Sequence, residues 1–178
     1  MRFAYCDPVY FGCGSLYDHP NANDWNNWSA HEDLMRRIQN EFPDGWALSL
    51  SVPSLHDYSV LAEQLEINYR LCVWTKPFAS FKPNVTVAYT WEPVILCGGR
   101  KRTREQPTVR DHLSESITLK KGLTGAKPLR FNQWILALLN WQPSDELVDM
   151  FPGTGGMAEA ISIGVHDLGG PRPQKGIT

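Results

Sequence analysis

The stretch Asp149-Met150-Phe151-Pro152-Gly153-Thr154-Gly155 closes an apolar run and opens a segment with helical pattern. It therefore predicts a buried strand, a glycine turn and a helix. Glycine tolerates positive φ angles and has no side chain to collide, which lets the backbone approach a nucleoside-type ligand closely. The spacing is not the six-residue fingerprint of dinucleotide-binding proteins, so a plain tight turn is the alternative interpretation.

A second strand with a polar turn lies at the other end of the chain, in Tyr5-Cys6-Asp7-Pro8-Val9-Tyr10. The apolar run over residues 2–6 stops at Asp7-Pro8, which predicts a buried strand that delivers a carboxylate to its C-terminal edge.

The residues between these two ends alternate between strand-like and helix-like patterns. Helices are predicted over 30–41, where Ser29 to Glu32 has capping-box spacing, over 55–65, and from about Pro128. Strands are predicted over 46–52, 69–74, 86–97 and 147–150, and Pro93 indicates a sheet edge or a bulge. The alternation predicts an α/β fold with a mostly parallel sheet covered by helices on both faces.

The 178 residues suit one domain, over 1–178, with an irregular Gly/Pro-rich tail at 165–178. Apolar residues make up 42% and charged residues 20% of the chain, typical of a globular protein. There is no apolar run of membrane-spanning length and no signal-like N-terminus, so a cytoplasmic location is expected. The four cysteines lack the close pairing of zinc sites, so we expect reduced thiols and no metal.

Charge is divided unevenly along the chain. Residues 98–130 hold nine Lys and Arg against three Asp and Glu, a net +6, and since the whole chain carries −2 the remainder is −8. Such a basic block fits a surface that faces a polyanion, although a solvated loop is the alternative. Within residues 98–127, the candidate nucleic-acid-binding residues are Arg100, Lys101, Arg102, Arg104, Lys120 and Lys121.

Residues 145–156 resemble the cofactor motif of S-adenosylmethionine-dependent DNA amino-methyltransferases. The positions that match this motif are Asp149, Phe151, Gly153 and Gly155. Gly125-Ala126-Lys127-Pro128 and the helix after it are similar to the Lys-Pro motif that precedes this strand in the permuted, β-type enzymes. The resemblance makes Lys127 a candidate partner of the cofactor's carboxylate.

Asp7-Pro8-Val9-Tyr10 resembles the catalytic Asp-Pro-Pro-Tyr motif of the same family, with Val9 in place of the second proline. The resemblance implies that Asp7 and the Pro8 carbonyl accept the hydrogens of an exocyclic amine, and that Tyr10 stacks on an extruded base. Asp at the first position favours adenine N6 over cytosine N4. Trp91-Glu92-Pro93 is similar to the family's aromatic-Glu strand, for which a site role and a solvent-exposed strand Glu are both open.

The resemblance implies a class I methyltransferase-like fold, permuted and shortened after the glycine motif, that methylates adenine N6 in DNA in a prokaryotic or phage-infected cell. Asp167 is the one candidate for the ribose-binding acid. A homodimer or a second subunit that completes the cofactor pocket stays open. The alternatives are a catalytically inactive DNA-binding or inhibitory relative and a different nucleotide-dependent α/β enzyme.

Overall fold

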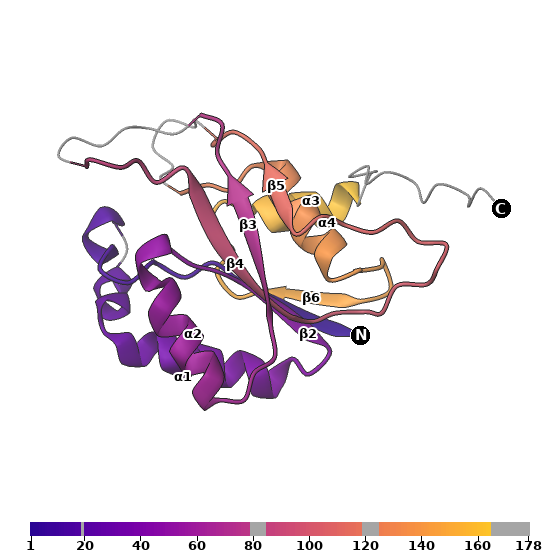
Figure 1. Cartoon of the computed structure of the whole chain (residues 1–178), viewed down its shortest axis with the longest axis horizontal. Helices are drawn as coiled ribbons and strands as arrows, with labels where there is room; N and C mark the ends of the chain where they lie inside the picture. Colours follow the sequence, from indigo (N-terminus) through magenta and orange to yellow (C-terminus); the bar gives the residue numbers. More distant parts are fainter. Residues whose placement is uncertain (19, 79–84, 119–124, 165–178) are drawn as a thin grey trace.

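Six strands form one sheet in the computed structural model, which describes residues 1–18, 20–78, 85–118 and 125–164 (Figure 1). The strand order is β5-β3-β4-β2-β1-β6. The bounds are β1 (Arg2–Cys6), β2 (Gly45–Ser49), β3 (Arg70–Thr75), β4 (Trp91–Gly98), β5 (His112–Ser114) and β6 (Glu146–Asp149). β1 is parallel to β2 and β6, β3 is parallel to β5, and β4 is antiparallel to both its neighbours. Five strands therefore share one direction, which confirms the mostly parallel sheet.

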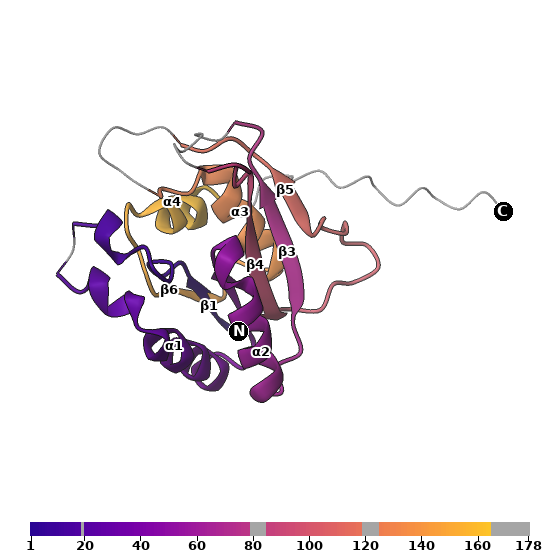
Figure 2. The same ribbon diagram turned by 60° about the vertical axis from the view of Figure 1, so that its left-hand side comes forward.

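Two pairs of helices cover the two faces of this sheet (Figures 1 and 2). The helices α1 (Trp28–Glu41) and α2 (Leu55–Gln64) pack on one face, and α3 (Leu129–Leu138) and α4 (Gly156–Ile163) on the other. Short 3-10 turns lie at Gly14–Leu16, Ala22–Asn26 and Val52–Ser54. The helices on both faces confirm the predicted α/β architecture.

Alternation along the strands divides the core into two layers. In β1, Phe3 and Tyr5 face α3 and α4, whereas Ala4 and Cys6 face α1 and α2, as the two-residue period of a strand requires. The predicted apolar face of α3 is confirmed, because Phe131, Trp134 and Ile135 are buried against the first layer.

The first helix begins earlier than its sequence pattern indicates. Its N-cap is Asn27, whose side chain accepts a hydrogen bond from the Ser29 backbone N–H at 3.2 Å, and Ser29 lies inside the helix. Asn caps a helix as effectively as Ser. The prediction of a capping box at Ser29 was therefore wrong, because Asn27, two positions earlier, is the N-cap.

Pro93 lies in a central strand, and the prediction of a sheet edge or bulge was wrong. It pairs with Val73 of β3, and its carbonyl accepts from Leu50 just beyond the end of β2. The N–H and C=O of a strand residue point to the same side, so the donor that proline lacks would point past the end of β2 rather than at β3. The ladder with β3 loses nothing.

The last strand and the basic block also differ from what their sequences predict. The last strand is a half-buried strand at the sheet edge rather than a fully buried one. Residues 98–127 were expected to be a basic insertion or a DNA-recognition loop, but His112–Ser114 within them form β5 and pair with β3. The tail 165–178, including Asp167, lies outside the described residues.

Within the described residues, no helix is long and apolar enough to cross a bilayer, and no cluster of His, Cys, Asp and Glu could hold a metal ion. Cys6, Cys13, Cys72 and Cys97 are free thiols, as predicted.

Candidate active site

The two motif-bearing turns lie side by side. Tyr5 of β1 is in register with Asp149 of β6, and the Met150 N–H donates to the Tyr5 carbonyl at 3.0 Å. Asp7 and the glycine turn therefore leave the sheet at the same edge, formed by the carboxyl ends of the parallel strands. Because β4 runs the other way, its first residues, with Glu92, lie at this edge too.

The glycine turn has the backbone geometry that its sequence predicts. Gly153 and Gly155 have φ angles of 44° and 78°, and Gly155 caps α4 in the left-handed conformation. The Gly155 N–H donates to the Pro152 carbonyl at 2.7 Å, which closes the turn. Phe151 packs edge-to-face against Trp25 at 5.1 Å between ring centroids.

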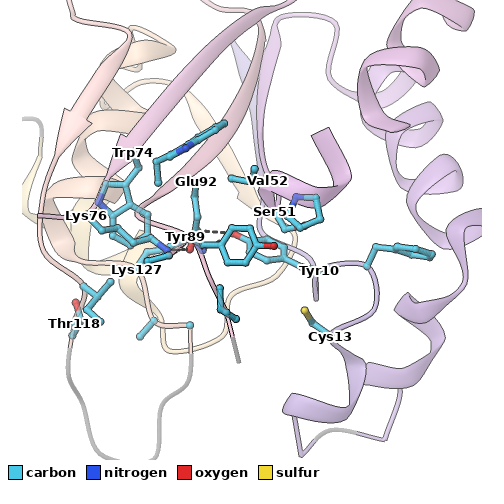
Figure 3. Close-up of a pocket in the computed structure, with 18 residues that line it drawn as sticks. Tyr10, Cys13, Ser51, Val52, Trp74, Lys76, Tyr89, Glu92, Thr118 and Lys127 are labelled. Carbon is cyan, nitrogen blue, oxygen red and sulfur yellow. Dashed lines mark hydrogen bonds and ion pairs between the residues drawn. The ribbon is translucent and has the colours of Figure 1, made fainter. Parts of the chain in front are cut away.

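Four charged side chains meet at this edge and form what we call the charge cluster: Asp7, Lys76, Glu92 and Lys127. Figure 3 labels three of them, Lys76, Glu92 and Lys127. Lys127 Nζ lies 3.0 Å from Asp7 Oδ1 and 3.1 Å from Glu92 Oε2, and it donates to the Tyr10 hydroxyl at 3.0 Å. The Tyr10 hydroxyl donates to Glu92 Oε2 at 2.8 Å, and Lys76 donates to the other Glu92 oxygen. The three hydrogens of Lys127 thus have three acceptors inside the protein.

The surroundings set different protonation preferences for the two carboxyl groups. Burial by itself would raise the pKa of Glu92, but the charges of Lys127 and Lys76 outweigh it and lower the pKa to about 2. Burial raises the pKa of Asp7 above its ordinary value, and the nearby Lys127 offsets this only in part. Burial opposes the charge of Lys127, yet Asp7 and Glu92 raise its pKa. Glu92 therefore stays ionised, and Asp7 is the carboxylate of the cluster that more readily takes a proton.

Two cavities open on either side of the charge cluster. The glycine-turn cavity, about 580 Å³, is lined by Asp7, Asn132, Trp25 and residues of the turn between Asp149 and Gly156. The aromatic cavity, about 400 Å³, is lined by the rings of Tyr10, Trp74, Tyr89 and Trp91 together with Lys76 and Glu92 (Figure 3). Both volumes fall in the range of small-molecule sites.

The two cavities share one stretch of wall, Gly125, Ala126 and Lys127. The Lys127 side chain is only 9% exposed. Its ammonium therefore separates a cavity with a glycine turn from a cavity with aromatic walls.

The internal contacts of Lys127 bear on the role that the family resemblance implied for it, which stays a prediction. Its sequence context made it the partner of a cofactor carboxylate, but in the structure Asp7, Glu92 and Tyr10 occupy its hydrogens. The spacing of Lys-Pro before a helix could not show that two carboxylates far away in sequence would converge on this amine.

Two of the candidate nucleic-acid-binding arginines are held by internal acceptors. Arg100 is bound to Asp145, which also holds the N-terminal amine, and Arg102 donates to the carbonyls of Ala137 and Pro107. Since Gly98 pairs with Gly45 at the start of β2, this segment lies at the amino ends of the parallel strands, away from the charge cluster. These internal bonds occupy part of each guanidinium group, and contact of Arg100 and Arg102 with nucleic acid stays a prediction.

Lys101 and Arg104 belong to this same segment after β4. Both residues are exposed, and their contact with nucleic acid stays a prediction. Lys120 and Lys121 lie outside the described residues.

Lys76 and Asn132 were not among the candidate site residues, whereas the sequence left a site role open for Glu92. Lys76 had a signal, since it stands just after the predicted strand over 69–74, which ends in Trp74. Asn132 had none, because a polar residue in an amphipathic helix normally faces solvent.

No known family model matches the chain, and no curated protein matches it in sequence. Solved structures do match its fold. M1.HpyAVI, solved as a complex with SAM, superposes with a TM-score of 0.60 at 14% identity over 91% of this chain and 76% of that one.

TTHA0409 from Thermus thermophilus, a presumed DNA modification methylase, gives a TM-score of 0.56 at 16% identity over 90% of this chain and 75% of its own. The same protein complexed with S-adenosyl-L-methionine gives 0.54 at 16% identity, over 89% and 75%. These matches confirm the methyltransferase-like α/β fold.

Proposed function

We propose that this protein is a DNA methyltransferase that moves a methyl group from S-adenosylmethionine to adenine N6. The observation that carries the proposal is the arrangement of the two cavities: Asp7 and the glycine turn border one, Tyr10 borders the other, and both meet at Lys127. Two ligands bound in them would have their reacting ends close together. The β-type order of the motifs, with the carboxylate turn first and the glycine turn last, is part of this proposal.

The glycine-turn cavity suits the cofactor in size and in chemistry. Its volume of about 580 Å³ is that of a small-molecule site. Gly153 and Gly156 line this cavity without a side chain that would hold a nucleoside away, and the buried Asn132 offers polar atoms. The fold neighbours M1.HpyAVI and TTHA0409 were both solved with this cofactor. When bound, the cofactor supplies a methyl group on a positively charged sulfur.

The aromatic cavity suits a nucleobase that has left the DNA stack. Extruding a base costs a few kcal/mol, and stacking on an aromatic ring returns about 1–3 kcal/mol per base. Tyr10 presents its ring in this cavity, and its hydroxyl is held by Glu92 at 2.8 Å and by Lys127 at 3.0 Å. These two bonds fix the ring before a base arrives.

Asp7 and the Pro8 carbonyl are the acceptors for the amine hydrogens. An exocyclic amine is a poor nucleophile because its lone pair is delocalised into the ring, and two acceptors favour the pyramidal form that can attack. One oxygen of Asp7 already accepts from Lys127, and an ionised carboxylate keeps further acceptor sites. The amine must lose a proton as its new bond to carbon forms, and the raised pKa of Asp7 suits it to receive that proton.

A methyl-transfer assay with labelled S-adenosylmethionine and mixed-sequence DNA tests the proposal. Wild-type protein should label DNA, and Asp7→Asn should reduce the rate at least about 100-fold, the scale of losing an acid–base group. Asp57→Asn, at an exposed position of α2, is the matched control and should act like wild type. Digesting the product to nucleosides shows which base carries the methyl group.

Methyl label found on cytosine N4 would support the methyltransferase activity but refute adenine as the target base. DNA binding without any methyl incorporation would refute catalysis and favour an inactive DNA-binding relative.

A further inference from the structure

Asn132 is a buried polar residue in the wall of the glycine-turn cavity. It lies in the first half of α3, with 3% of its surface exposed. A methyl group added at Gly156 would come within 2.7 Å of Asn132 Nδ2, so the amide lies directly against the start of α4.

The side chain of Asn132 has no hydrogen-bond partner among residues 1–18, 20–78, 85–118 and 125–164. Its backbone N–H donates to the Pro128 carbonyl, but its side-chain amide makes no such bond. Other buried amides of the same region are partnered, since Gln133 donates to the Gly164 carbonyl and Asn140 to the Arg100 carbonyl. Among the described residues, the fully buried side-chain atoms without a partner are Arg100 Nε and Trp141 Nε1, so the unpartnered amide of Asn132 is not sealed in the core. It faces the cavity that Asn132 lines, where a bound molecule can pair with it.

The first turn of α4 adds donors at the same place. The backbone N–H groups of Gly156, Met157 and Ala158 have no acceptor among the described residues, as is usual in a first helical turn. Gly155 caps the helix without a side-chain bond, so no carboxylate or hydroxyl of the cap takes this position. Unpaired N–H groups at a helix start attract negative charge.

We infer that Asn132, together with the first turn of α4, binds the carboxylate at the amino-acid end of S-adenosylmethionine. This rests on the proposed function and moves to Asn132 the role that the sequence assigned to Lys127. Lys127 is less suited to it, because Asp7, Glu92 and Tyr10 already accept its three hydrogens. Asn132 Nδ2 lies in the same cavity wall and donates to no acceptor in the part of the chain that the structure describes.

Calorimetric titration with two ligands tests this assignment. S-adenosylhomocysteine keeps the amino-acid end, and 5′-methylthioadenosine lacks it. Asn132→Ala should bind S-adenosylhomocysteine about tenfold more weakly, equal to about 1.4 kcal/mol, and 5′-methylthioadenosine within twofold of wild type. Asn132→Asp should lose still more for S-adenosylhomocysteine, because it would place a second carboxylate beside that of the ligand.

The matched control is Gln133→Ala, which removes a neighbouring buried amide of α3 that does not line the cavity. It should leave both affinities within twofold. Thermal unfolding of each variant is measured first, and Asn132→Asp, which keeps the shape of the side chain, carries the test where the alanine variant does not fold.

Two results would overturn the inference while leaving the proposed function intact. Equal weakening of both ligands by Asn132→Ala would place the amide at the nucleoside, and tighter binding by Asn132→Asp would place it at the ammonium of the ligand. A wild-type protein that binds neither ligand would refute the proposed function itself and this inference with it.

Discussion

Replacing Glu92 with Gln should destabilise the protein strongly while hardly changing its shape. Glu92 holds Lys76 with one oxygen and Lys127 and Tyr10 with the other. Gln has nearly the same size but no charge, so Lys76 and Lys127, whose side chains are 12% and 9% exposed, would lose the counter-ion that they share. Breaking a buried ion pair from one side is costly because the remaining charge stays desolvated.

The size of the effect follows from the pKa of Glu92. It falls from an ordinary value of 4.5 to about 2, so folding favours the charged over the neutral form by roughly 3 kcal/mol, at about 1.36 kcal/mol per pKa unit. A neutral Gln should lose about this much stability at pH 7. The unfolded state binds more protons than the folded state between pH 4.5 and pH 2, so the contribution of Glu92 is complete above pH 4.5 and declines as the pH falls through that range.

Urea unfolding of both proteins at pH 7 and at pH 4 measures the effect. The control is Glu146→Gln, because Glu146 is an exposed carboxylate whose pair with Arg2 should be worth under about 1 kcal/mol. A loss at Glu92 no larger than the loss at Glu146, or a difference that grows as the pH falls, would refute the reasoning.

Three further perturbations probe separate parts of the structure. Tyr10→Phe removes a hydroxyl that bonds Glu92 and Lys127, so urea unfolding should show about 1–2 kcal/mol less stability. Because the ring remains, DNA affinity measured by anisotropy should stay within twofold of wild type. A larger drop in affinity would mean that the hydroxyl itself contacts DNA. Gly156→Ala places a methyl group 2.7 Å from the Asn132 amide, so calorimetry should show S-adenosylhomocysteine affinity reduced about tenfold or more; an unchanged affinity would mean that the ligand binds elsewhere. Arg102→Ala should reduce stability by about 1–3 kcal/mol, because the carbonyl of Ala137 loses its donor, and should leave DNA affinity within twofold; a large loss of DNA affinity would place Arg102 at the DNA interface.

The sequence predicts those parts of the fold that depend on local pattern. Buried strands, the apolar face of α3 and the glycine turn all follow from periodicities of two or 3.6 residues and from the φ preference of glycine. The closeness of Asp7 to the glycine turn also follows, because both leave neighbouring parallel strands at their carboxyl ends.

The charge cluster could not be predicted because it depends on tertiary packing. Lys76 and Lys127 lie 51 positions apart in the chain and converge on Glu92 only because β4 runs antiparallel and brings its first residues to the edge where β3 ends. The same limit explains Arg100 and Arg102, since a run of cations in the sequence does not reveal the internal acceptors that bind them.

The single ammonium that separates the two cavities has a consequence for how the protein handles two molecules at once. Lys127 lines both cavities, so a molecule bound in either one changes the electrostatic environment of a side chain that also borders the other. Cofactor and nucleic acid should therefore bind with heterotropic coupling, and thermodynamic reciprocity requires that each alters the affinity of the other by an identical factor. One side chain and its counter-ions would then set the size of this coupling.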